Sequence, residues 1–235
     1  MSALCLIPAR GGSKRIPRKN IIPFCGKPLI AHSIGNALNS GIFDAVVVSS
    51  DDEEIIAVAR TYGATVPFVR PQNLSDDFAS STEVVRHAIT TLAEAGQHYE
   101  LVCCLYATAP LVDAGILREA FAEFKRGGAE FLFSAAEFSA PIQRAFYLDE
   151  ERRVRMFDEG QYFSRSQDLT PAFFDAGAFY FGKSRAWMEG GVMFRPHAAA
   201  FVLGRNLVCD IDTPQDLEWA KILYQNKEEQ CLLKK

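Results

Sequence analysis

The feature that most constrains the fold of this chain is a regular alternation of short apolar runs with helix-like segments. The runs are rich in Val, Ile, Leu and Phe, as buried strands are, and they occupy residues 4–8, 45–49, 65–69, 101–106, 130–134, 178–181, 199–203 and 207–211. Apolar residues spaced by three or four positions predict helices over residues 29–39, 53–62, 80–95, 115–125 and 213–224. The alternation predicts a three-layer α/β/α fold with a mostly parallel, mixed sheet.

The alternation fails over about residues 136–168, where Pro141, a run of charges and several aromatic residues occur together. Such a segment is either a flap over a ligand or an arm that forms a dimer, because aromatic and Arg residues are enriched where surfaces are buried on association. We favour the dimerisation arm. The whole chain of 235 residues, arm included, is expected to form one domain, with a frayed tail after Lys227.

Charge and composition exclude several classes of protein. The formal net charge of −4 argues against a nucleic-acid-binding surface, although the basic run over residues 14–19 suggests a small anionic ligand. The N-terminus lacks the order of a secretory signal and no apolar run reaches membrane-spanning length, so we expect a cytoplasmic protein that does not bind a membrane. The six cysteines form no C-x-x-C pair, which argues against a structural zinc site or a disulfide framework.

A glycine-rich basic loop follows the first predicted strand. Residues 10–14 read Arg-Gly-Gly-Ser-Lys, and the basic character continues to Lys19. Glycines let backbone N–H groups approach phosphate oxygens and basic side chains neutralise them, so the loop has the chemistry of a triphosphate site. Neither a Walker A loop nor a dinucleotide fingerprint occurs. A solvated basic turn has the same composition, but the position at the carboxyl end of a strand favours a ligand site.

Two acids, Asp210 and Asp212, lie two positions apart on the last predicted strand. Alternate residues of a strand point to one face, so both carboxylates would face one site. Mg²⁺ commonly takes one or two carboxylates and adds water and substrate phosphates, so we predict that this pair holds Mg²⁺. Alternatively, Asp212 or Thr213 caps the helix that begins at Pro214, which explains one acid but not both. The acids at 51–54 are interpreted as partners of a helix N-terminus.

Several segments, in order along nearly the whole chain, resemble the acylneuraminate cytidylyltransferases. They are residues 7–14 (IPARGGSK), Lys19-Asn20, residues 26–30 (GKPLI), Arg70-Pro71 and Asp210-Ile211-Asp212. Residues 106–111 (YATAPL), 165–169 (RSQDL) and 175–177 (DAG) are similar to the branch that activates pseudaminic acid. The resemblance implies a Rossmann-like nucleotidyltransferase fold and a homodimer formed through the arm. It also implies transfer of CMP from CTP to an acidic nine-carbon sugar, with release of pyrophosphate.

The resemblance also implies roles for individual residues. Catalysis would fall to Arg10 and Lys19. The nucleotide site would comprise Ala9, Arg10, Gly11, Ser13, Lys14, Lys19, Asn20, Arg70, Ala79 and Ser81. The sugar candidates are Tyr106, Thr108, Gln143, Arg144, Arg165, Gln167, Asp175 and Tyr180. Arg70 suits cytosine, because an arginine donates to the acceptors O2 and N3 and rejects uracil, whose N3 is a donor. Its alternative role is that of a surface arginine before a proline.

Other functions stay open at this point. N-acetylneuraminate is the second candidate sugar, although Ala176-Gly177 and Gln143 stand where sialic acid enzymes have Asn-Gly and Lys. A non-catalytic nucleotide-binding protein is a further class, against which the paired acids argue. A nucleotidyltransferase acting on a neutral sugar 1-phosphate is another, and it needs a phosphate already on the sugar. No residue stands out as a general base.

Overall fold

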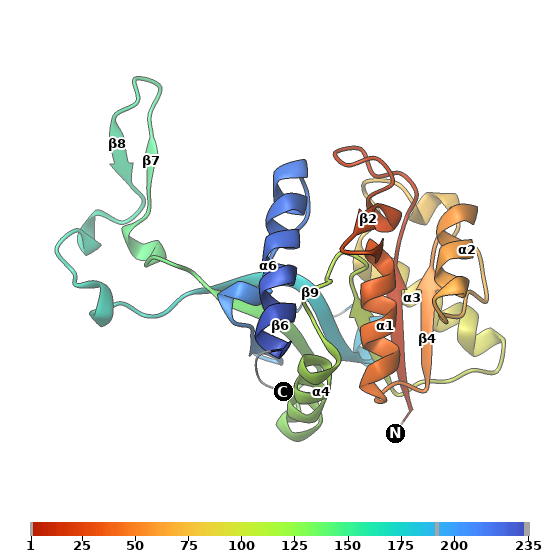
Figure 1. The fold of residues 1–235 in the computed structure, drawn as a ribbon. Coiled ribbons are helices and arrows are strands. Elements are labelled where there is room, and N and C mark those ends of the chain that lie inside the picture. Colours follow the sequence, from red (N-terminus) through yellow and green to blue (C-terminus); the bar gives the residue numbers. More distant parts are fainter. Residues whose placement is uncertain (1, 191–192, 233–235) are drawn as a thin grey trace.

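The computed structural model describes residues 2–190 and 193–232, and its centre is a six-stranded sheet in the order β10-β6-β9-β5-β1-β4 (Figure 1). The strands are β1 (Ala3–Pro8), β4 (Ala45–Ser49), β5 (Leu101–Leu105), β6 (Phe131–Glu137), β9 (Phe173–Lys183) and β10 (Ala198–Val202). β1 pairs in parallel with β4 and β5, and β6 with β10, whereas β9 runs antiparallel to β5 and β6. The predicted mixed, mostly parallel sheet is confirmed.

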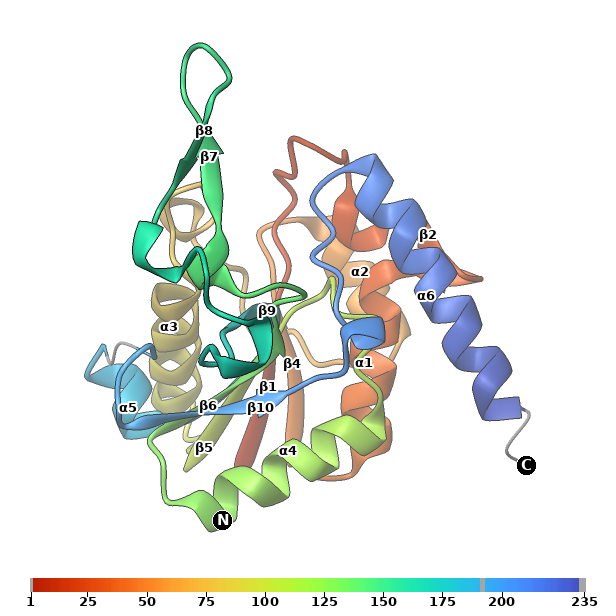
Figure 2. The ribbon, with the colours of Figure 1, turned by 90° about the vertical axis from the view of Figure 1, so that its left-hand side faces the viewer.

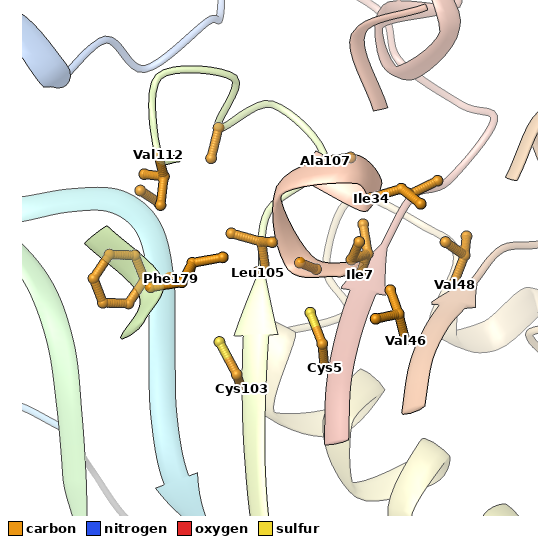
Figure 3. Close-up of a cluster of buried hydrophobic side chains, with 14 of the residues drawn as sticks. Cys5, Ile7, Ile34, Val46, Val48, Cys103, Leu105, Ala107, Val112 and Phe179 are labelled. Carbon is orange, nitrogen blue, oxygen red and sulfur yellow. The ribbon is translucent and has the colours of Figure 1, made fainter. Parts of the chain in front are cut away.

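Helices cover both faces of the sheet because strand residues alternate between the faces. Cys5 and Ile7 of β1 face a core that is shared with α1 (Leu29–Ser40), α2 (Glu53–Thr61) and α4 (Ala114–Gly127). Leu4 and Leu6 face the opposite core, which is built with α3 (Ser81–Glu94) and α5 (Ser184–Met188). Figure 2 shows α3 and α5 on one side of β1 and α1 on the other, and Figure 3 shows Cys5 and Ile7 pointing into the first core. The three-layer prediction is therefore confirmed.

Capping side chains stabilise the starts of α2 and α3. The Asp52 carboxylate accepts the backbone N–H groups of Glu54 and Ile55 and so caps α2, as expected for the acids at 51–54. Ser80 and Glu83 form a capping box at α3, which fixes the start of the helix at Ser81. Among the described residues, no helix is long and apolar enough to cross a bilayer.

Two predicted strands and one helix end were wrong. In the described chain, residues 65–69 make a single bridge from Thr65 to Val47, because Pro67 has no N–H with which to continue a ladder. Residues 207–211 are the end of a short turn and an extended loop, and the buried Ile211 packs against Phe24 rather than in the sheet.

The last helix, α6 (Pro214–Leu232), continues past the expected frayed end at Lys227. Lys227 donates to the carbonyl of Leu111 at 2.6 Å and pairs with Asp113 at 2.8 Å, which ties α6 to the start of α4. Residues 233–235, the end of the predicted tail, lie outside the described residues.

Residues 138–172, which we call the arm, leave the sheet between β6 and β9 and project from it (Figure 1). The arm contains an antiparallel hairpin of β7 (Phe146–Leu148) and β8 (Val154–Met156) that the sequence pattern did not predict. Its large apolar side chains face solvent in this chain, and Phe157 and Phe163 are 72% and 91% exposed. Such exposure of large apolar side chains is unusual on the surface of a globular protein.

Candidate active site

A polar cavity of about 280 Å³ lies beyond the carboxyl ends of β1 and β5. β1 is flanked by β4 on one side and β5 on the other, so the chain order reverses here, at the point where open α/β sheets bind ligands. All the residues predicted for the nucleotide site line this cavity except Ala9 and Gly11. The fold therefore brings together loops from three distant parts of the sequence.

Polar contacts with neighbouring segments hold the basic loop after β1 in place. The side-chain amide of Asn20 donates to the carbonyl of Arg10 at 2.9 Å, and the N–H of Gly11 donates to Asp51 at 3.0 Å. A Cβ on residue 11 would stand 2.7 Å from the Asp52 carboxylate, so only glycine fits there. The Gly11 N–H is thus engaged by a carboxylate in this structure and braces the loop, rather than facing the cavity as the sequence suggested.

The cations of this loop already have carboxylate partners. Asp77 lies 2.7 Å from the Arg10 guanidinium and 2.5 Å from the Lys14 ammonium, and their hydrogen bonds lower the pKa of its carboxyl. Asp212 lies 2.8 Å from Arg15 and 3.2 Å from Lys19. Sequence reasoning missed Asp77, whose only signal was an acid close before the predicted residues Ala79 and Ser81. The triphosphate that the sequence predicts here would have to replace Asp77 as the partner of both cations.

We therefore expect Asp77→Asn to lower the KM for CTP several-fold, because the amide no longer competes with phosphate oxygens for Arg10 and Lys14. Steady-state kinetics at low salt measure the change. Asp76→Asn is the matched control, since the Asp76 carboxylate accepts the backbone N–H groups of Phe78 and Ala79 and is not paired with these cations. A higher KM in Asp77→Asn would instead place Asp77 among the groups that bind the nucleotide.

Asp210 and Asp212 lie in the loop before α6, so the strand geometry predicted for them is wrong. Thr213 caps α6, as the alternative allowed: its hydroxyl accepts the N–H of Asp216 at 3.3 Å, and the Asp216 carboxylate accepts the N–H of Thr213 at 2.7 Å. Capping therefore does not explain Asp212. Burial and the charge of Asp212 raise the pKa of the Asp210 carboxyl. A cation would relieve that repulsion, so the chemistry of the pair fits a metal ion.

A site with two carboxylates suits a metal ion that needs few protein ligands. Among the described residues, no group of three or more His, Cys, Asp or Glu side chains could hold a metal. Mg²⁺ satisfies this condition, because it takes one or two carboxylates and completes its shell with water and phosphate oxygens. Lys19 links the pair to the cavity, since its ammonium donates to the carbonyl of Ile211 at 2.6 Å.

Arg70 lines the cavity as a buried cation, only 5% exposed, so the alternative of a surface arginine is wrong. Its guanidinium donates to the carbonyls of Ser49 at 2.6 Å and Leu74 at 3.4 Å, and its Nε has no partner among the described residues. Burial lowers its pKa to about 10, which still leaves it charged at neutral pH. A buried cation on the wall of the cavity suits a ligand rich in acceptors.

The predicted sugar residues fall into two groups. Tyr106 and Thr108 line the cavity, and Tyr180 is buried beside Tyr106 with its hydroxyl donating to Asp175 at 2.8 Å. The other candidates, Gln143, Arg144, Arg165 and Gln167, lie on the arm, which Figure 1 shows projecting away from β1 and β5. The fold of one protomer thus does not bring the arm residues to its own cavity.

Comparison with known proteins agrees with this geometry. A family model described as cytidylyltransferase matches residues 4–230. The pseudaminic acid cytidylyltransferase of Campylobacter jejuni is 66% identical over 97% of this chain and 99% of its own length. The N-acylneuraminate cytidylyltransferase of Escherichia coli is 29% identical over 97% of this chain and 53% of its own.

Solved structures show the same fold at low sequence identity. A CMP:2-keto-3-deoxy-manno-octonic acid synthetase complexed with CTP superposes with a TM-score of 0.71 at 16% identity, covering 97% of this chain and all of the other. At that identity the likeness concerns the fold alone, which it supports along the whole length. The family match, the close relative and the fold all agree: this chain belongs to the cytidylyltransferase family.

Proposed function

We propose that this protein transfers CMP from CTP to the anomeric hydroxyl of pseudaminic acid and releases pyrophosphate. The observation that carries the proposal is a single cavity that combines the cations of the basic loop with the buried Arg70. The loop suits a triphosphate and Arg70 suits the acceptors of cytosine. The choice of sugar is supported by the 66% identity to the pseudaminic acid cytidylyltransferase of Campylobacter jejuni.

In this reaction the anomeric oxygen of the sugar forms a bond to the α-phosphorus of CTP, and the bond from that phosphorus to the α,β-bridging oxygen breaks. That oxygen leaves as part of pyrophosphate, and the proton of the sugar hydroxyl passes to water. Arg10, Lys14 and Lys19 would bind the phosphates and neutralise the charge that develops on them. Asp210 and Asp212 would hold Mg²⁺, which, when bound, polarises phosphate oxygens and lowers the pKa of a nearby hydroxyl. Burial raises the pKa of Tyr106 to about 12, so its hydroxyl keeps its proton at neutral pH and does not serve as a general base.

The functional assay crosses CTP and UTP with pseudaminate, N-acetylneuraminate and 3-deoxy-manno-octulosonate, and follows the release of pyrophosphate. We expect the highest kcat/KM for CTP with pseudaminate and little product with UTP. Preference for N-acetylneuraminate would select the second candidate sugar. Turnover only with a sugar 1-phosphate, or none with any free sugar, would contradict the proposed reaction.

We also infer that the protein forms a homodimer through the arm. Burial of Phe157 and Phe163 against a second copy would remove their apolar surface from water, which stabilises association. The arm residues Gln143, Arg144, Arg165 and Gln167 could then contribute to the partner's site, since they do not reach the cavity of their own chain.

The mass in solution, measured by light scattering, tests the dimer. We expect twice the protomer mass for the unmodified protein and a shift towards one protomer mass in Phe157→Asp and Phe163→Asp. Tyr62→Asp, which adds the same charge at the residue that follows α2, away from the arm, is the matched control and should leave the mass unchanged. A protomer mass for the unmodified protein would contradict the inference.

A further inference from the structure

Four polar side chains form a path from the cavity into the sheet, and we call Ser81, Tyr106, Tyr180 and Asp175 the hydroxyl path. The Ser81 and Tyr106 hydroxyls lie 2.7 Å apart. The rings of Tyr106 and Tyr180 have centroids 5.3 Å apart at an angle of 51°, and the Tyr180 hydroxyl donates to Asp175 at 2.8 Å. The path thus joins the start of α3, the segment after β5, and β9.

The protons on this path have a fixed direction at the Asp175 end. One oxygen of Asp175 accepts the N–H of Gly177 at 2.9 Å and the other accepts the Tyr180 hydroxyl. The Tyr180 hydroxyl therefore uses its only hydrogen as a donor to Asp175, and its oxygen can accept hydrogen bonds from other donors. Burial raises the pKa of both tyrosines above the ordinary value, so both remain protonated donors at neutral pH. The path acts by orientation rather than by accepting a proton.

The path joins residues that the sequence assigned to different ligands. Ser81, assigned to cytidine, and Tyr106, assigned to the sugar, both line the cavity together with Arg70. Tyr180 is only 5% exposed and packs in the core of the sheet, so a ligand meets it through Tyr106.

The backbone under Tyr180 is fixed as well. The Ser134 hydroxyl accepts the N–H groups of Ala178 and Phe179 at 3.2 and 3.1 Å, at the point where the register between β6 and β9 shifts. β9 is therefore a rigid support, and Tyr106 is the member of the path that contacts both a cavity-lining hydroxyl and this support.

We propose that Tyr106 is a positioning residue that couples the cytidine end of the site to the sugar end. The inference rests on the proposed function. A nucleotide that contacts Ser81 fixes the Ser81–Tyr106 hydrogen bond, and the ring of Tyr106 is then already ordered against Tyr180 when the acidic sugar binds. Coupling of this kind is reciprocal, so each ligand should raise the affinity for the other by the same factor.

The test measures the Kd of pseudaminate by calorimetry, with and without a saturating CTP analogue whose α,β-bridging oxygen is replaced by methylene. The ratio of the two constants is the coupling factor. We expect Tyr106→Phe to reduce this factor about five-fold, the size of one neutral hydrogen bond. The Kd of pseudaminate without nucleotide is measured in the same variant, and the loss of affinity should be larger with nucleotide bound than without it.

Ser81→Ala removes the same hydrogen bond from the other side, so it should cause the same loss, and the double variant should add nothing further. Tyr99→Phe is the matched control, because it removes an exposed hydroxyl that bonds to Gln97 at 3.3 Å, away from the cavity. Its coupling factor should equal that of the unmodified protein.

Two outcomes overturn the inference. One is an equal weakening of pseudaminate with and without nucleotide in Tyr106→Phe, which would mean direct contact with the sugar only. The other is a coupling factor of one in the unmodified protein. Failure of the proposed function is read separately, as absence of pyrophosphate release by the unmodified protein with CTP and pseudaminate.

Discussion

Arg10→Ala is expected to lower kcat about 10³-fold, because a single arginine that stabilises transferring phosphates contributes ~10³ to 10⁵ in rate. Arg10 lines the cavity directly after β1, and its guanidinium is paired with Asp77 on the cavity wall. Its side chain is 32% exposed and makes no contribution to the buried core, so its removal should leave the fold intact. Initial rates of pyrophosphate release over a CTP series measure the effect.

Arg15→Ala is the matched control for Arg10→Ala. Arg15 lies on the same loop and lines the same cavity, but its side chain is 67% exposed and pairs with Asp212. We expect its loss to cost less than about ten-fold, as for an exposed ion pair. A variant Arg10→Ala that kept its kcat and only raised the KM would show that Arg10 binds substrate and transition state equally, and the catalytic assignment would then be wrong.

The layers of the fold could be predicted because burial on both faces leaves a strong pattern in the sequence. Leu4 and Leu6 face one core while Cys5 and Ile7 face the other, which makes the whole strand apolar. The position of the basic loop followed from the same pattern, because a loop that leaves a parallel strand at its carboxyl end lies at the ligand-binding edge. Arg10, Lys14 and Lys19 were found for this reason.

What the sequence could not predict depends on contacts between distant segments. An apolar run such as residues 207–211 is compatible with a strand, and only the packing of Ile211 against Phe24 places it elsewhere. The position of Asp77 just before Ala79 and Ser81 was too weak a signal, because its role arises when the loop after Pro71 folds back onto Arg10 and Lys14. The spacing of apolar residues in a sequence indicates how a segment is buried. It does not indicate which charged side chains will meet across the cavity, because those pairs form only in the complete fold.

Asp210→Asn is expected to lower kcat about 10²- to 10³-fold at limiting Mg²⁺, because a metal ion supplies several kcal/mol of charge stabilisation to phosphoryl transfer. The variant is more informative than Asp212→Asn, which would also release Arg15 and Lys19 from their carboxylate partner. Titration of the rate with Mg²⁺ measures the effect, and high Mg²⁺ should recover part of it, since the remaining carboxylate and the phosphates still offer ligands.

Glu218→Gln makes the same change of charge on α6, where Glu218 is an exposed partner of Lys221, and it should titrate like the unmodified protein. Removal of divalent ions by EDTA should abolish the activity of the unmodified protein, and added Mg²⁺ should restore it. Normal turnover of Asp210→Asn at limiting Mg²⁺ would contradict the assignment. The raised pKa of the Asp210 carboxyl would then reflect burial beside Asp212 alone, and the ion would have to be held by the phosphates of CTP and water.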